Sequence, residues 1–359
     1  MKISFPYMDN PVLYYKLLRW LGHEVIVPPR PTQKTIKMGV KYAPEFACFP
    51  LKVIMGTYME VYEMGADTII TSGGQGPCRA GFYGRVHQKI LDNSRINLDI
   101  IIFDSPKDWR PFLRNVRRLQ KGTSWPDFLL TVRAAYRLAH SLDRIERFMH
   151  RQRAYTDTRQ ASLAWDDIKA RYMKIKTSKE IPEVERWARE RLQRIEYCYP
   201  HPSNRIKIGI IGEIYVVMEG STNNDIEAML NELGCEVERA HYVSEYVDSH
   251  LVPWRFKDHQ HILEKGSRYL EIKIGGHAKR SIGHVVDFKE RGFDGVIHLK
   301  PFGCLPEIVA QSILDKVSRD LDMPVLSLSV DEQLAKANVQ TRIEAFLDLI
   351  RQKRGVKVA

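Results

Sequence analysis

The chain has 359 residues, 44% of them hydrophobic and 28% charged, a globular composition that excludes a largely disordered protein. This length suits two or three cores, on an allowance of roughly 100–200 residues per domain. The sequence holds no run of ~18 apolar residues that would span a bilayer. Residues 1–6 read as a first core strand, with no apolar region of a signal peptide. We therefore expect a soluble cytoplasmic protein without a membrane partner.

Short apolar runs alternate with amphipathic stretches over the first hundred residues, as in a sheet wrapped by helices. Strands separated by helices pair in parallel, so residues 1–106 are predicted to form a doubly wound α/β domain. The pattern predicts strands at 2–5, 24–27, 67–71 and 99–103, helices at 11–21 and 50–64, and a long loop through Pro28, Pro29 and Pro31.

Residues 107–204 lose the strand pattern, and their apolar residues recur at helical spacing. From residue 107 to 200 there are 22 Lys and Arg against 12 Asp and Glu, which accounts for nearly all of the formal charge of +11. We expect a basic helical insert and linker here. Its surface is either a docking face for an acidic partner, a nucleotide-like ligand or nucleic acid, or simply a solvated helix face.

The α/β pattern restarts at residue 205 and predicts a second doubly wound domain over 205–359. Its strands are expected at 205–212, 236–239, 295–299 and 324–328, with a helix at 224–233.

Three of the five cysteines are predicted to lie where a parallel sheet binds ligands, beyond the carboxyl ends of its strands. Cys48 directly precedes the helix at 50–64, Cys78 follows the strand at 67–71 in a glycine-rich turn, and Cys304 follows the strand at 295–299. Helix N-termini lower the pKa of a thiol and favour the thiolate that a metal needs.

The other two cysteines have structural positions. Cys235 follows a helix-closing glycine at the opposite edge of the sheet, and Cys198 lies at the linker. The odd number and wide spacing of cysteines do not suggest a disulfide framework, so the thiols should be reduced. Without a C-x-x-C pair, spacing leaves both metal binding and core packing open.

At these cysteines the sequence resembles the family of 2-hydroxyacyl-CoA dehydratases and benzoyl-CoA reductase-type subunits, in its branch of CoA-substrate-specific enzyme activase-related proteins. The resemblance covers both α/β halves, whereas the basic helical stretch matches nothing specific. The blocks that carry it are Glu45–Lys52 with Gly65–Asp67, Gly76–Gly84, His298–Pro306, Gly209–Tyr215 with Asn223 and Asn224, and Ser327–Gln333.

The resemblance implies two flavodoxin-like domains that hold a [4Fe-4S] cluster between them, with Cys48, Cys78 and Cys304 as ligands. One iron would then lack a cysteine and could take water, a substrate oxygen, another side chain or a sulfide.

Four further residues are candidates around such a site. Glu213, at the end of the first strand of the second domain, is the candidate catalytic neighbour of the open iron, or else a helix cap or salt-bridge carboxylate. Gln75, Arg79 and Lys300 lie near the cysteines in sequence and are candidate donors to cluster sulfur, or else solvated surface residues.

The resemblance also implies an ATPase activator of the actin and Hsp70 type as electron donor, together with oxygen sensitivity and an anaerobic source. We find no such ATPase domain and no G-x-x-x-x-G-K-[ST] loop in this sequence, and Arg79 stands where a dinucleotide fingerprint needs its third glycine. ATP hydrolysis is therefore expected on another polypeptide, for which the basic stretch is a reasonable docking surface. A homodimer or heterodimer is compatible with these features.

Three functional hypotheses follow. The first is a [4Fe-4S] electron-transfer or reductase component, with a 2-hydroxyacyl-CoA dehydratase-type subunit as its narrower form. The second is a binding module that uses the basic stretch for nucleic acid or an acidic protein; no interleaved aromatic motif supports RNA binding. The third is a cysteine nucleophile, Cys78 paired with His87.

Overall fold

The computed structural model describes residues 1–72, 78–103, 109–198, 205–251, 257–272 and 274–355. The chain divides into two compact units. The first unit comprises Met1–Ser141 and Lys169–Ile181, and the second comprises Leu142–Ile168 and Pro182–Ala359.

The first unit is built on a four-stranded parallel sheet of order β2-β1-β3-β4. Its strands are β1 (Lys2–Ser4), β2 (Glu24–Val25), β3 (Thr68–Ser72) and β4 (Asp99–Phe103). The chain goes from β1 to β2 at one edge of the sheet and from β3 to β4 at the other, so the carboxyl ends of the neighbouring strands β1 and β3 form the switch point. The predicted parallel α/β architecture is confirmed.

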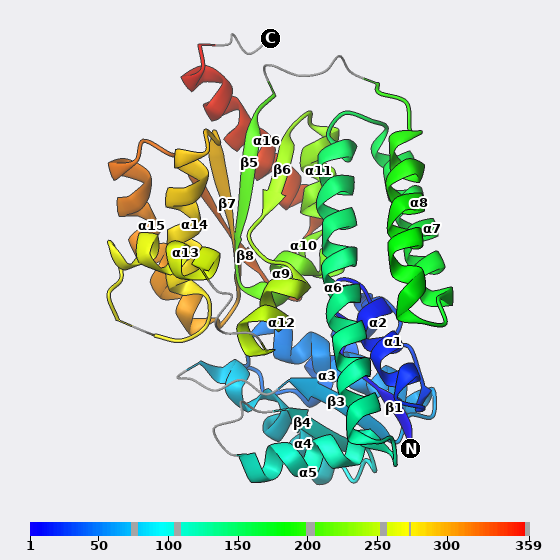
Figure 1. The fold of residues 1–359 in the computed structure, drawn as a ribbon. Coiled ribbons are helices and arrows are strands. Elements are labelled where there is room, and N and C mark those ends of the chain that lie inside the picture. Colours follow the sequence, from blue (N-terminus) through cyan, green and yellow to red (C-terminus); the bar gives the residue numbers. More distant parts are fainter. Residues whose placement is uncertain (73–77, 104–108, 199–204, 252–256, 273, 356–359) are drawn as a thin grey trace. The chain divides into compact units, whose positions relative to one another are not determined.

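Five α-helices and one 3-10 turn follow these strands (Figure 1). Pro50 stands in the first turn of α3, where a missing N–H costs no hydrogen bond. The helical segments are α1 (Val12–Trp20), α2 (Gln33–Tyr42), α3 (Phe49–Glu63), η1 (Arg79–Phe82), α4 (Tyr83–Asn93) and α5 (Trp109–Gln120).

Helix α2 corrects the expectation of a long loop after Pro31. Thr32 caps it: the Thr32 hydroxyl accepts from the Lys34 N–H, and the Thr35 hydroxyl accepts from the Thr32 N–H. The helix packs directly on α3, because Gly39 has no side chain where a Cβ would lie 1.8 Å from the Lys52 carbonyl oxygen. The three prolines obscured a helix that depends on this contact.

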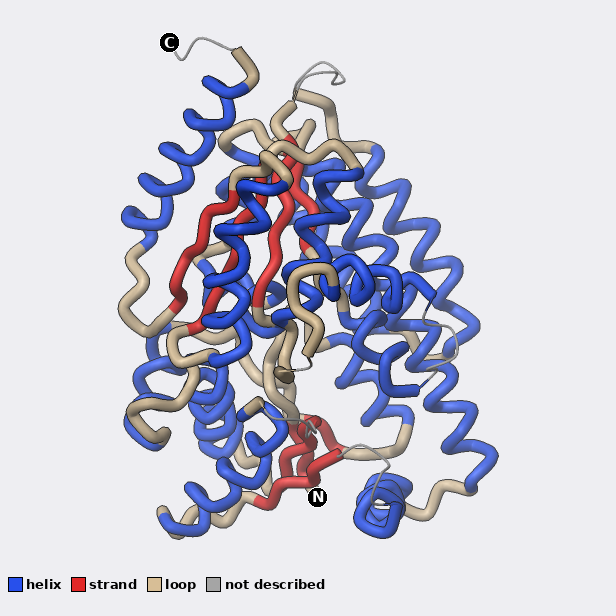
Figure 2. Tube along the Cα trace, turned by 90° about the vertical axis from the view of Figure 1, so that its left-hand side faces the viewer, coloured by secondary structure: helices blue, strands red, loops and turns tan. Residues whose placement is uncertain are grey.

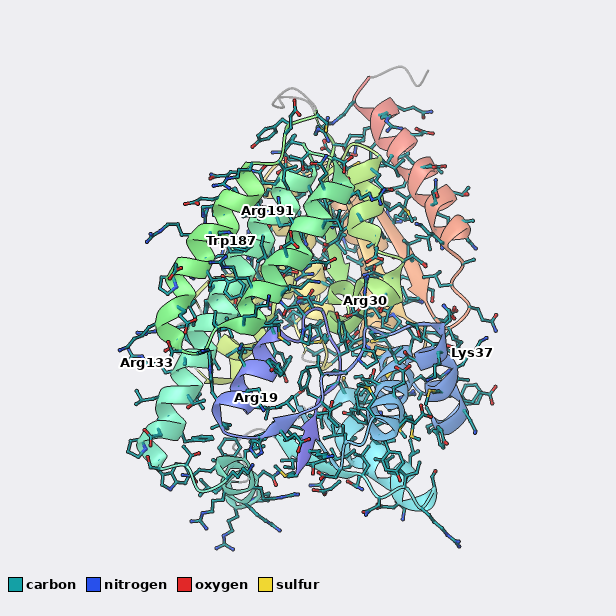
Figure 3. The ribbon with its side chains drawn as sticks, turned by 90° about the vertical axis from the view of Figure 1, so that its right-hand side faces the viewer. Arg19, Arg30, Lys37, Arg133, Trp187 and Arg191 are labelled. Atoms are coloured by element: carbon teal, nitrogen blue, oxygen red, sulfur yellow. The ribbon has the colours of Figure 1, made fainter. Side chains whose placement is uncertain are left out.

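Residues 109–198 form helices, and the only β pairing described there is an isolated bridge between Thr156 and Tyr197. Basic side chains lie along these helices, for example Arg133 on α6 and Arg191 on α8 (Figure 3). The helical structure agrees with the spacing of the apolar residues; a separate insert remains a prediction. After α5 come α6 (Trp125–Arg153), α7 (Thr158–Lys174), η2 (Ser178–Glu180) and α8 (Ile181–Gln193).

The second unit repeats the parallel design, with strand order β6-β5-β7-β8. Figure 2 draws the strands in red. The strands predicted at 205–212, 236–239, 295–299 and 324–328 are all confirmed, with small shifts at their ends. They are β5 (Lys207–Gly212), β6 (Glu236–Arg239), β7 (Gly295–Pro301) and β8 (Val325–Val330).

Helices α14 and α15 cover one face of this second sheet and α11 and α16 the other (Figure 1). Phe288 of α14 and Leu314 of α15 pack with Val296 of β7 in the core on the first of these faces. The helices are α9 (Ile214–Met218), α10 (Gly220–Asn223), α11 (Ile226–Glu232), α12 (Val243–Leu251), α13 (Lys257–Ser267), α14 (Ala278–Glu290), α15 (Leu305–Asp320) and α16 (Lys336–Lys353). No described helix is both long and apolar enough to cross a membrane.

Candidate metal centre

Cys48 is the N-cap residue of α3 in the first unit. Its side chain is 5% exposed and packs with Ala47 and Leu51. The first turn of a helix leaves backbone N–H groups without helical partners, and their positive field favours a thiolate. The structure thus confirms Cys48 at the start of this helix, although the preceding element is α2 rather than a strand.

Cys78 caps the 3-10 turn η1, which leads into α4. Its sulfur accepts a hydrogen bond from the Ala80 N–H at 3.3 Å, so a backbone donor already points at this sulfur. The preceding glycine-rich turn, with the candidate Gln75, lies outside the described residues.

The Cys48 and Cys78 loops lie side by side in the first unit. Arg79, next to Cys78, donates to the Phe46 carbonyl oxygen at 2.6 Å. The Tyr83 hydroxyl lies 2.6 Å from the Cys48 sulfur. The candidate donor Arg79 therefore binds the backbone that precedes Cys48, and it joins the two cysteine loops.

Cys304 is the N-cap residue of α15 in the second unit, directly after β7. Gly303 has φ +75°, a left-handed conformation that suits glycine and turns the chain from strand into helix. Pro306 occupies the first turn of α15. The candidate Lys300 lies partly buried on β7, four residues before the cysteine.

A buried hydrogen-bond cluster holds the two ends of the Cys304 loop together. His298 of β7 and Glu307 of α15 are both 0% exposed, and His298 Nε2 lies 2.9 Å from Glu307 Oε2. The Ser281 hydroxyl donates to the same carboxylate oxygen at 3.1 Å, and His298 Nδ1 lies 3.1 Å from the Ser327 hydroxyl. These hydrogen bonds tie β7 to the start of α15 and so hold the loop that contains Cys304.

Glu213 caps α9 at the carboxyl end of β5: Oε2 accepts from the N–H groups of Tyr215 at 3.0 Å and Val216 at 3.2 Å. Burial raises the pKa of Glu213 to about 7, and the nearby negative charge of Glu307 adds to the rise. This capping role is one of the two readings that the sequence left open. A carboxyl group that titrates near neutral pH can also exchange a proton.

The raised pKa of Glu213 makes folding stability depend on pH. Below pH ~4.5 the carboxyl is protonated in both folded and unfolded chains; as pH rises toward 7, only the unfolded chain ionises freely, so the folded state loses stability. Glu213→Gln removes this titration but keeps an oxygen for the cap. We expect the difference in free energy of unfolding between this variant and the wild type to change by about 1–3 kcal/mol in favour of the variant as the pH rises from ~4 to ~8. Urea unfolding across this range measures the difference, and parallel curves would contradict the assignment.

The two cysteines predicted to be structural lie apart from these loops. Cys235 is 1% exposed before β6, and burial raises its thiol pKa to about 12. Cys198 is exposed, and its N–H donates to the Tyr155 carbonyl oxygen. A thiol with a raised pKa is a poor metal ligand at neutral pH, which favours a packing role for Cys235.

The cysteine-nucleophile hypothesis requires a thiol–imidazole pair, and the structure does not form it. His87 Nε2 lies 3.0 Å from the Leu51 carbonyl oxygen, and its Nδ1 has no partner among the described residues. Its ring packs against Tyr58 and Tyr83.

A second group of potential ligands, His261, Asp287 and Glu290, brings its ligand atoms within 4.8 Å of one another. The Lys265 ammonium already lies there, 2.6 Å from Asp287 and 2.8 Å from Glu290. A lysine cation therefore occupies the position that a metal would take.

The cysteine set fits an iron–sulfur cluster chemically. All five cysteines belong to the described residues, and none forms a disulfide. Sequence reasoning missed Tyr83, His298 and Glu307, which support the Cys48 and Cys304 loops. The only local signal was that Tyr83 and His298 lie in the same short blocks as Cys78 and Cys304, with Glu307 one residue beyond the second block, because their contacts come from tertiary packing.

The fold and these loops define an α/β protein of two parallel-sheet units, in which three cysteines stand at the N-termini of helical segments. Residues 138–350 match the family model described as 2-hydroxyglutaryl-CoA dehydratase, D-component, and residues 2–71 match the CoA enzyme activase uncharacterised domain. The first match covers more than half of the chain, which therefore belongs to the 2-hydroxyacyl-CoA dehydratase and activase-related family. A search of curated proteins gave no match.

The matches refine the expected extent of the resemblance. The dehydratase D-component match begins within α6, so it includes α7 and α8 of the helical stretch, which we expected to match nothing. Cys48 and Cys304 each fall inside a match, and Cys78 falls between the two.

Proposed function

We propose that this chain binds one [4Fe-4S] cluster through Cys48, Cys78 and Cys304 and works in low-potential electron transfer or ATP-coupled reduction. The observation that carries the proposal is that each of these cysteines is the N-cap of a helical segment, with Cys78 after β3 and Cys304 after β7. Cys235 shows the contrast, because it is buried before β6 and burial raises the pKa of its thiol. A bound cluster would supply one-electron transfer.

Membership in the dehydratase family supports a narrower form of this proposal. The chain would serve as a dehydratase-type or reductase component that acts on a CoA thioester or another small substrate. We infer a flavodoxin-like arrangement in both units, since strand orders β2-β1-β3-β4 and β6-β5-β7-β8 place the switch point beside the cysteine loops. Glu213 is the candidate acid–base group, because its carboxyl gains and loses a proton near neutral pH.

Anaerobic purification tests the proposal directly. We expect a brown protein with broad visible absorption and about four irons per chain. A colourless, iron-free protein after anaerobic reconstitution with iron and sulfide would overturn the proposal. Salt-sensitive binding of nucleic acid by such a protein would support the binding-module alternative.

We further propose that an ATPase activator of the actin and Hsp70 type donates the electrons and docks on α5. This helix has four arginines and no acidic residue. Val116 and Leu119 are buried, and Asn115 donates to the Ile102 carbonyl oxygen, so these residues hold α5 on the first sheet.

The opposite face of α5 carries the charge. Arg114 and Arg117 are exposed and have no ion-pair partner among the described residues. With Arg110, Arg118 and Leu113 they line a hollow of about 500 Å³. Arginines around an apolar centre are typical of protein interfaces, and guanidinium groups pair well with carboxylates.

Reversal of this charge should slow docking. We expect Arg114→Glu/Arg117→Glu to lower the rate of ATP-dependent cluster reduction by the activator at least ~10-fold at low salt, through slower association. The rate of reduction by dithionite should be unchanged. The matched control is Arg159→Glu/Lys174→Glu, which reverses two exposed charges on α7. Equal rates for both double variants would place the docking site elsewhere.

A further inference from the structure

We propose that Tyr83 is a positioning residue that donates its phenolic hydrogen to the Cys48 sulfur and thereby raises the reduction potential of the cluster. The Tyr83 hydroxyl oxygen lies 2.6 Å from this sulfur. The inference rests on the cluster proposed above, but the contact itself lies wholly within the first unit.

The direction of this hydrogen bond follows from the chemistry of a ligand. In the free thiol, either group could donate. A cysteine that binds iron has lost its proton, so its sulfur can only accept. The O–H group of Tyr83 is then the donor.

The tyrosine is held in place by a second contact one helical turn away. His87 is 0% exposed, and its Nε2 lies 3.0 Å from the carbonyl oxygen of Leu51, in the first turn of the helix that Cys48 caps. Burial lowers the pKa of His87 to about 4, so the ring is neutral and Nε2–H donates to this carbonyl. Tyr83 and His87 together fasten the start of α4 to the start of α3.

Gly84 allows this close packing. A Cβ at Gly84 would lie 2.7 Å from Ile102 Cγ1 and 3.2 Å from Thr71 Cγ2. The first turn of α4 therefore approaches β3 and β4 more closely than a larger residue permits. This approach carries Tyr83 to Cys48, 35 residues away in sequence.

The contact has a defined electrostatic effect. A hydrogen bond to a cysteine sulfur withdraws electron density from the ligand, and it stabilises the reduced cluster, which carries one more negative charge, more than the oxidised one. Tyr83 should therefore make the potential less negative. The Ala80 N–H, which donates to the Cys78 sulfur, acts in the same direction.

The test is the midpoint potential of the reconstituted protein, followed by the visible spectrum during a reductive titration. Tyr83→Phe keeps the ring and removes the donor, so we expect the iron content of the wild type and a more negative potential. The matched control is Val86→Ala. The Val86 side chain packs against the same hydrophobic group of Ala47, Cys48 and Leu51 but has no polar atom. Its potential should equal that of the wild type.

The outcomes separate the two proposals. A wild-type protein that takes up no iron overturns both. An iron-loaded Tyr83→Phe protein with an unchanged potential, or an equal shift in Val86→Ala, overturns the role of Tyr83 alone. If Tyr83→Phe loses its iron, 3-fluorotyrosine at this position keeps the ring and donates a stronger hydrogen bond. It should move the potential upward, and no movement would overturn the inference.

Discussion

Replacement of Cys48, Cys78 or Cys304 with alanine should abolish cluster binding. In each variant two thiolates remain from a set of three, and the lost ligand leaves a second iron without cysteine. We expect the iron content to fall from about four per chain toward zero, with loss of the visible absorption. Iron and sulfide analysis after anaerobic reconstitution measures the result.

Cys235→Ala is the matched control for these variants. This cysteine is buried like Cys48, but its thiol pKa is raised to about 12 and it stands before β6 rather than at the start of a helix. Its iron content should equal that of the wild type. Equal losses in all four variants would show that the cysteines matter for packing, and normal iron in any of the three ligand variants would remove that cysteine from the set.

Loss of the buried ion pair between Arg239 and Glu146 should have the largest effect on stability. Arg239 Nη2 lies 2.7 Å from Glu146 Oε2, and both side chains are 3% exposed. The Arg239 guanidinium also lies 4.5 Å from the centre of the Tyr242 ring. Arg239→Met leaves the Glu146 carboxylate buried without this cation, and we expect the free energy of unfolding to fall by about 3–5 kcal/mol.

Urea unfolding measures this loss, and the adjacent residue of β6 provides the control. Glu238 pairs with Arg291 at 2.6 Å, but the Arg291 side chain is 42% exposed. Arg291→Met should cost less than about 1 kcal/mol, because water screens an exposed pair. Glu146→Gln/Arg239→Met removes the stranded charge and should recover part of the loss. A small effect of Arg239→Met, similar to that of Arg291→Met, would contradict the burial argument.

Much of the fold could be predicted from local signals. The strand at 99–103 and the strand at 236–239 are found at the predicted residues, because short apolar runs bounded by turn residues are typical of buried parallel strands. The helix at 33–42 was missed. Its cap uses two threonines, and its closest packing depends on Gly39 and Gly56, which the local pattern does not reveal.

Some features of the candidate site could likewise be predicted from local signals, and others depend on tertiary contacts. Pro50 after Cys48, and Gly303 and Pro306 beside Cys304, predict helix starts, and both cysteines are N-caps in the structure. The hydrogen bond from Arg79 to the Phe46 carbonyl could not be foreseen, since it joins residues 33 positions apart. The capping of α9 by Glu213 was one of two readings, and only the structure shows that it is made.

The sequence by itself determined the two parallel α/β halves, the helical stretch between them and the position of Cys48, Cys78 and Cys304 at the start of helical segments, because strand periodicity and turn chemistry act over a few neighbouring residues. Only the tertiary structure decided which groups surround those cysteines. The Tyr83 hydroxyl at the Cys48 sulfur and the carboxylate of Glu307 on His298 are contacts between separate elements. Such contacts depend on how helices and strands pack, and packing is set by the whole chain.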